Sequence, residues 1–313
     1  MLKTIALKRD LKDGRFFKNL KKCLPPGHAG LEPEILKKVG STLLGLSDLQ
    51  SILIMPSGAP EITALASQLY LAQITGDAIP VFTPACPDWS RDERGRYDFK
   101  SLGSDPSHTA KKLIEEGKSV IGCLYDNGIP YEGVIIFADW GMETEIDTTD
   151  SYGEQVSPDE VVRRFSQSFG ATAKYLENVR GGKEEHIFRS YRITSMTEFL
   201  SQRLGDPKVI YQRCREKFLQ DPGPNKLLHR YADVSLPVNH DRFGIDEPTN
   251  FQMSLQTLAE YATLGEAVDS GIILAGESHT ASQAYNVLRP RNQKIPTLFL
   301  KGKKGVDEGE NIL

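Results

Sequence analysis

The chain has 313 residues, and its 42 acidic against 38 basic side chains give a formal net charge of −4. This acidic balance disfavours nucleic acid as a partner, because such proteins present a basic surface. Apolar residues make up 39% of the sequence, which is enough for a substantial core and is not typical of disorder. No apolar run is long enough for a membrane span or a signal peptide. We therefore expect a cytoplasmic protein that binds a small-molecule substrate and has no membrane contact.

Cysteines and histidines give no metal signature. The four cysteines (Cys23, Cys86, Cys123 and Cys214) form no C-x-x-C pair, and the six histidines form no H-E-x-x-H motif. This spacing rules out a zinc site built from close cysteine pairs and predicts reduced, mostly buried thiols. The sequence predicts no metal ligands and identifies no cofactor.

The first part of the chain predicts an arm that leads into a strand–helix–strand unit. Residues 1–48 are expected to form an N-terminal arm and a short helix over 32–39, with Pro33 in its first turn. The apolar run at 51–55 predicts a strand buried on both faces, and 79–83 predicts the next strand. The helical pattern between them predicts a parallel crossover.

Predicted helices and strands continue to alternate to the end of the chain. A helix over 107–122 and a strand over 134–138 are expected, followed by a mostly helical insertion at 158–220 and an ordered loop at 221–250. The last predicted elements are a helix over 251–268, a strand over 271–275, a helix over 279–288, a strand over 295–300 and a flexible tail at 301–313. This order predicts one Rossmann-like α/β domain over 49–300, a doubly wound, mostly parallel sheet with an additional helical layer.

Ligands of such sheets bind outside the carboxyl ends of the strands, so the turns there hold the candidate residues. Ser57 and Gly58 follow the first strand and begin a helix, where free N–H groups suit a phosphate or carboxylate. The simpler alternative is that Ser57 only caps that helix. After the second strand, Trp89, Ser90 and Arg91 are expected to form a substrate wall, or a surface loop anchored by the tryptophan.

Acidic residues follow the third predicted strand. Asp139 stands at the tip of an apolar strand, where an unpaired carboxylate is costly to bury, so a catalytic role is expected. Glu143, Glu145 and Asp147 alternate and share one face of an extended chain. That face suits Mg²⁺ or a substrate amine, and it equally suits a solvated edge strand.

The fourth turn places Ser278 beside His279, where a helix-capping serine is favoured over a nucleophile. Polar groups of the predicted loop, among them His240, are candidates for a general acid or base. The catalytic candidates are therefore Asp139, Ser90, Arg91 and His240, and the substrate-binding candidates are Ser57, Gly58, Trp89, Glu145 and Ser278.

The order of these turns over about residues 64–150 resembles the isocyanide (isonitrile) synthase family. The resemblance rests on the Pro-spaced turn at 79–90, Leu102-Gly103, Tyr125-x-x-Gly128, and Asp139 with Glu145 downstream. It implies an enzyme of specialised metabolism that acts on an amino-acid-derived substrate, with Asp139 orienting or deprotonating the substrate amine. Trp89 stands where that family has a lysine, and Trp140 separates Asp139 from the following glycine.

Alternatives from other classes remain open. One is a nucleotide-dependent transferase that binds Mg²⁺ through the acidic residues after the third strand. An aminoacyl-tRNA-dependent enzyme resembling cyclodipeptide synthases is another, since Ser57 imitates that family's strand-end serine. Its Tyr-x-x-x-Glu helix is not found at 158–220 or at 251–268. The last is a non-catalytic α/β protein that binds a ligand or a partner.

Overall fold

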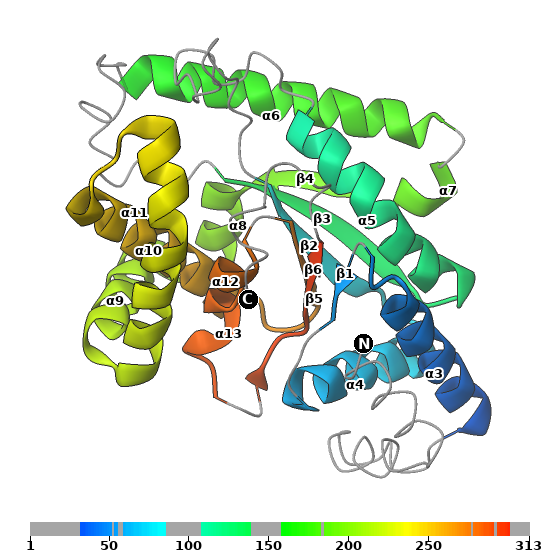
Figure 1. Ribbon diagram of the computed structural model, residues 1–313. Coiled ribbons are helices and arrows are strands. Elements are labelled where there is room, and N and C mark those ends of the chain that lie inside the picture. Colours follow the sequence, from blue (N-terminus) through cyan, green and yellow to red (C-terminus); the bar gives the residue numbers. More distant parts are fainter. Residues whose placement is uncertain are drawn as a thin grey trace.

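The computed structural model describes residues 32–51, 53–55, 59–85, 108–138, 158–182, 185–276, 278–290 and 293–300. A six-stranded sheet lies between two helical layers, with the strand order β1-β6-β5-β2-β3-β4 (Figure 1). The strands are β1 (Leu53–Ile54), β2 (Ile79–Ala85), β3 (Tyr131–Phe137), β4 (Arg192–Ser195), β5 (Ile272–Ala275) and β6 (Thr297–Leu300). This architecture confirms the predicted α/β class with a mostly parallel sheet.

The centre of the sheet is the parallel pairing of β2 with β3, from Ile79 opposite Tyr131 to Ala85 opposite Phe137. Strands β5 and β4 extend it in parallel on either side, and β6 continues in parallel beyond β5. The edge strand β1 pairs with β6 in the antiparallel direction.

The predicted parallel crossover from 51–55 to 79–83 is therefore wrong. Two strands, β6 and β5, lie between β1 and β2, and β1 runs opposite to both of them. An apolar run predicts that a strand is buried, but it does not name the neighbour or the direction of pairing.

One helical layer is built from helices within residues 33–188 and the other from helices within residues 196–287 (Figure 1). The first layer contains α3 (Pro33–Asp48), α4 (Ala59–Thr75), α5 (His108–Asp126), α6 (Pro158–Arg180) and α7 (Glu185–Phe188). The second contains α8 (Met196–Arg203), α9 (Pro207–Gln220), α10 (Pro222–Phe243), α11 (Glu247–Ala267), α12 (His279–Ser282) and α13 (Ala284–Val287).

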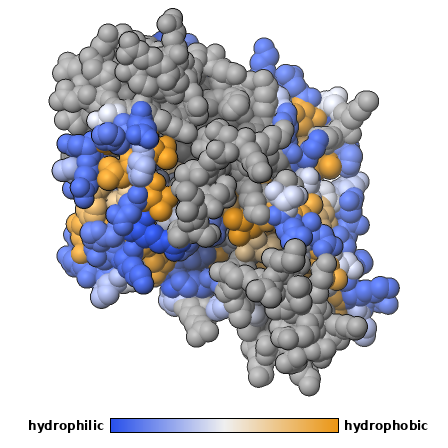
Figure 2. All heavy atoms as spheres, viewed as in Figure 1, coloured by the Kyte–Doolittle hydropathy of each residue, from blue (hydrophilic) through white to orange (hydrophobic). Residues whose placement is uncertain are grey.

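Alternating side chains of the strands separate the two cores. On β3, Ile135 and Phe137 pack with the first layer, whereas Val134 and Ile136 pack with the second. Because successive strand side chains point to opposite faces, an apolar run such as 134–137 packs against helices on both sides of the sheet. On the face shown in Figure 2, the described residues are mainly hydrophilic, with hydrophobic groups among them.

The segment 221–250, predicted as a loop, is helical: α10 occupies most of it and α11 begins within it. Pro237 inside α10 removes one backbone donor. The buried Asn250 of α11 donates from Nδ2 to the carbonyl of Ala232 at 2.8 Å, while Ser235 donates to the Asn250 Oδ1 at 3.1 Å. The polar residues of this segment, which suggested a loop, instead form hydrogen bonds between α10 and α11.

Smaller differences concern element boundaries. Helix α3 extends well past residue 39 because Val39, Leu43 and Leu46 are fully buried on its inner side. The segment 158–220 is mostly helical as predicted but also contains β4, and the helix expected over 279–288 is divided into α12 and α13. The predicted arm before residue 32 and tail after 300 lie outside the described residues. None of the described helices is long and apolar enough to cross a membrane.

A pair of helical glycines tests the packing of α11 against α13. A Cβ added at Gly265 would overlap the backbone carbonyl of Tyr285, whereas a Cβ at Gly170 in α6 meets no neighbour within 4 Å. We expect Gly265→Ala to destabilise the protein by about 1–3 kcal/mol, and Gly170→Ala to stabilise it by about 0.5–1 kcal/mol. Urea denaturation of both variants measures this difference. Equal shifts would contradict the close approach of the two helices.

Candidate functional site

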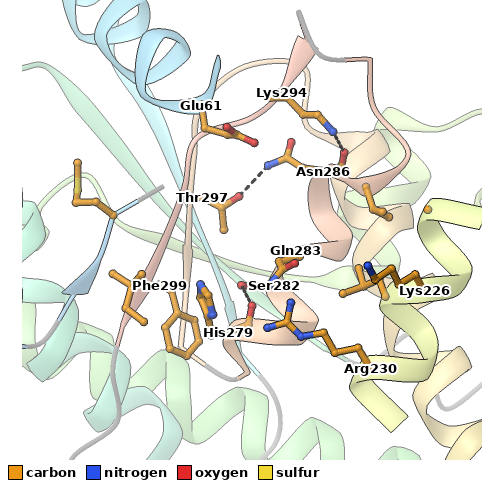
Figure 3. Close-up of a pocket in the computed structure, with 15 residues that line it drawn as sticks. Glu61, Lys226, Arg230, His279, Ser282, Gln283, Asn286, Lys294, Thr297 and Phe299 are labelled. Atoms are coloured by element: carbon orange, nitrogen blue, oxygen red, sulfur yellow. Dashed lines mark hydrogen bonds between the residues drawn. The ribbon is translucent and has the colours of Figure 1, made fainter. Parts of the chain in front are cut away.

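A cavity of about 640 Å³ lies between α10, α12 and α13, the first turn of α4 and the paired strands β1 and β6 (Figure 3). This volume lies within the range of small-molecule sites. Its apolar surface comes from Ile54, Met55, Leu227, Val287 and Phe299. The His279 ring meets the Phe299 ring edge-to-face, with centroids 5.4 Å apart. The remaining lining residues are mainly polar, and most of their charged groups are basic.

Lys226 and Arg230 form the basic side of this cavity. They stand four residues apart on α10, so they share one face of the helix, and both side chains point toward α12 and α13 (Figure 3). Neither side chain forms a hydrogen bond or ion pair with any residue in the described part of the chain. Unpaired cations on a concave surface attract an anion, and a phosphate or carboxylate suits an arginine fork beside a lysine.

Lys294 lines the cavity from the segment before β6, and Glu61 lines it from the first turn of α4. The Lys294 ammonium donates to the backbone carbonyl of Asn286. Burial lowers the pKa of Lys294; the negative Glu61 opposes this shift, and the nearby positive Arg289 adds to it. The net direction makes this ammonium easier to deprotonate than an exposed lysine.

The buried Asn286 fixes the wall that carries Lys294. Its Nδ2 donates to the Ile295 carbonyl at 2.7 Å, and its Oδ1 accepts from the Ile295 N–H at 2.7 Å. The same Nδ2 lies 3.3 Å from the Thr297 Oγ1. A side-chain amide thus bonds to the backbone as a neighbouring strand would, which holds the start of β6 against α13.

Of the predicted site residues, the structure describes Ser278 and His240. Ser278 is buried and its Oγ accepts from the Ala281 N–H at 3.1 Å, so it caps α12, as the alternative to a nucleophile expected. His240 is exposed near the end of α10, with its Nδ1 3.6 Å from the Asp241 Oδ1. Neither residue lines the cavity. Ser57, Gly58, Trp89, Ser90, Arg91, Asp139 and Glu145 lie outside the described residues.

The expectation that all the strand-end turns share one edge of the sheet is wrong for the first of them. Because β1 is antiparallel to β6, its carboxyl end points away from the edge where β2, β3 and β5 end. The cavity residues were missed because Lys226 and Arg230 lie in the segment interpreted as a loop. The sequence signal for this pair is its four-residue spacing, which places two side chains on one face only where the segment is helical.

No family model matches the sequence, and no curated protein matches it. Among solved structures, AlbC, a cyclodipeptide synthase from Streptomyces noursei, matches with a TM-score of 0.40 and 10% identity, over 72% of this chain and 96% of that one. A cyclo(L-leucyl-L-phenylalanyl) synthase matches with a TM-score of 0.42 and 12% identity, over 75% and 95% of the two chains.

These comparisons correct the resemblance to isocyanide synthases. The solved structures found are cyclodipeptide synthases, and no isocyanide synthase model matches the sequence. The resemblance depended on short turn motifs, and Trp89 and Trp140 already departed from them. At 10% and 12% identity and these TM-scores, the two matches supply no argument about activity.

Substitution of Ser278 tests its role as the N-terminal cap of α12. Replacing it with alanine removes the acceptor for the Ala281 N–H, so Ser278→Ala is expected to lower the free energy of unfolding by about 1 kcal/mol. Ser278→Asp keeps an acceptor oxygen and is expected to retain most of that stability. Chemical denaturation compares the two variants. Equal losses in both would show that the hydroxyl serves another purpose.

Proposed function

We propose that this chain binds a phosphate-bearing ligand in the cavity and transfers a group from it, as a nucleotide- or aminoacyl-tRNA-dependent transferase. The observation that carries the proposal is the Lys226–Arg230 pair, which faces the cavity without a counter-ion in the described part of the chain. Cyclodipeptide synthesis, the activity in the names of the two matched structures, is one reaction of this class.

The chemistry of the cavity supports a phosphate ester over a simple hydrophobic ligand. Arg230 offers paired N–H donors in the planar geometry that phosphate oxygens accept, and Lys226 adds a point charge one helical turn away. Phe299 and Met55 provide an apolar surface within the same cavity. A ligand with a charged phosphate and a less polar base or acyl group therefore matches both parts.

A non-catalytic binding protein is the second candidate, and one observation favours it. Ser282 lines the cavity, but its hydroxyl donates to the backbone carbonyl of His279 at 2.8 Å. A serine nucleophile needs its proton accepted by a base, and a peptide carbonyl is not one. A protein of this second kind binds the ligand and leaves it unchanged.

Binding of inorganic pyrophosphate, measured by isothermal titration calorimetry, tests the anion site. We expect Lys226→Gln and Arg230→Gln each to weaken binding by about tenfold, because each removes a charge-assisted contact. Binding is also expected to weaken as salt is added. Lys174→Gln is the matched control, since Lys174 is exposed on α6 and does not line the cavity.

Equal affinities in the wild type and both α10 variants would contradict the anion site. Incubation with charged tRNA or with a nucleotide, followed by mass spectrometry of the products, separates the two candidates. A transferase yields a new small-molecule product that the Lys226→Gln/Arg230→Gln double variant fails to make. Binding without turnover points to the non-catalytic alternative.

A further inference from the structure

Glu61 is the acidic residue of a cavity whose other ionisable groups are basic. Lys226, Arg230, Lys294 and His279 line the same space. Glu61 projects from α4 on the side of the cavity opposite Lys226 and Arg230 (Figure 3). Two cations therefore lie on the α10 side of the cavity, and the carboxylate lies on the α4 side, where Lys294 feels its charge.

Within the described part of the chain, the Glu61 carboxylate interacts with Lys294 through charge alone. It forms no hydrogen bond and no ion pair there, although it is half-buried. The Lys294 ammonium donates its hydrogen bond to the Asn286 carbonyl and not to this carboxylate. A carboxylate to which no protein donor bonds can accept hydrogen bonds from a ligand.

Glu61 lies in the first turn of α4, a helix that extends over Ala59–Thr75. A negative side chain interacts favourably with the positive end of a helix dipole. Glu61 also lines the cavity, so a ligand in the cavity can reach its carboxylate.

We propose that Glu61 determines ligand specificity by receiving a positively charged nitrogen group, an amine or a guanidinium, on the same ligand whose anionic end binds Lys226 and Arg230. This inference rests on the proposed function for its anionic end. It adds that the ligand carries opposite charges at its two ends. A phosphate ester without a cationic group fills only the α10 side and leaves Glu61 unpaired.

Matched alkyl phosphates test the assignment by calorimetry. The probes are ω-aminoalkyl, ω-guanidinoalkyl and plain alkyl phosphates, each with short, medium and long spacers. At the best spacer length, the wild type is expected to bind one of the charged probes at least about tenfold more tightly than the plain alkyl phosphate. Comparison of the two charged series shows which nitrogen group Glu61 prefers.

The variant Glu61→Gln should lose this preference while still binding plain alkyl phosphate, because the amide keeps the shape and removes the charge. Glu177→Gln is the control: it makes the same change at an exposed position of α6 away from the cavity. Thermal unfolding of both variants checks that they are folded.

The anion site and the role of Glu61 are overturned by different results. No binding of plain alkyl phosphate, or binding unaffected by Arg230→Gln, overturns the anion site itself. Normal binding of plain alkyl phosphate with no preference for either charged probe overturns the role of Glu61 alone. A preference that persists in Glu61→Gln also overturns it, since another acceptor must then hold the charged group.

Discussion

The parallel pairing of β2 with β3 is the constraint on which the remaining structure depends. It extends from Ile79 opposite Tyr131 to Ala85 opposite Phe137 and is buried on both faces. A strand pair with apolar side chains on both faces requires a helical layer on each side. The second layer, formed from the later half of the chain, brings α10 and α13 beside β6, and the cavity lies in the space that they enclose with α4.

Polar groups around the cavity fall into two kinds, and the difference between them indicates the binding surface. The amide of Asn286 and the guanidinium of Arg289 are used within the protein: Asn286 bonds to Ile295, and Arg289 donates to the carbonyl of Gly265 at 2.6 Å. Lys226 and Arg230 have no such bonds with the described residues. Asn286 and Arg289 are satisfied within the protein, whereas Lys226 and Arg230 retain their charge for a ligand.

Net charge and composition are averages over the chain, and they did not reveal this local arrangement of charged groups. A net charge of −4 disfavours an extended nucleic-acid surface, but it does not describe a cavity in which the basic residues outnumber Glu61 among the described lining residues. In the same way, the Pro and Asn content of 221–250 suggested a loop, whereas Asn250 bonds to the carbonyl of Ala232 and supports a helix that contains Pro237. Composition reports what a segment contains, and only the neighbours show how those groups are used.

The sequence by itself determined the α/β class, the buried strands predicted at 79–83 and 134–138 and most of the helices, because the spacing of apolar residues is a local property that burial imposes directly. Tertiary structure alone decided the antiparallel direction of β1 and the meeting of Glu61, Lys226 and Lys294 in one cavity. Periodicity specifies which face of an element is buried, but it does not specify what covers that face. Strand order and the partners of a charge depend on contacts between segments far apart in the chain, and short turn motifs carry no information about those contacts.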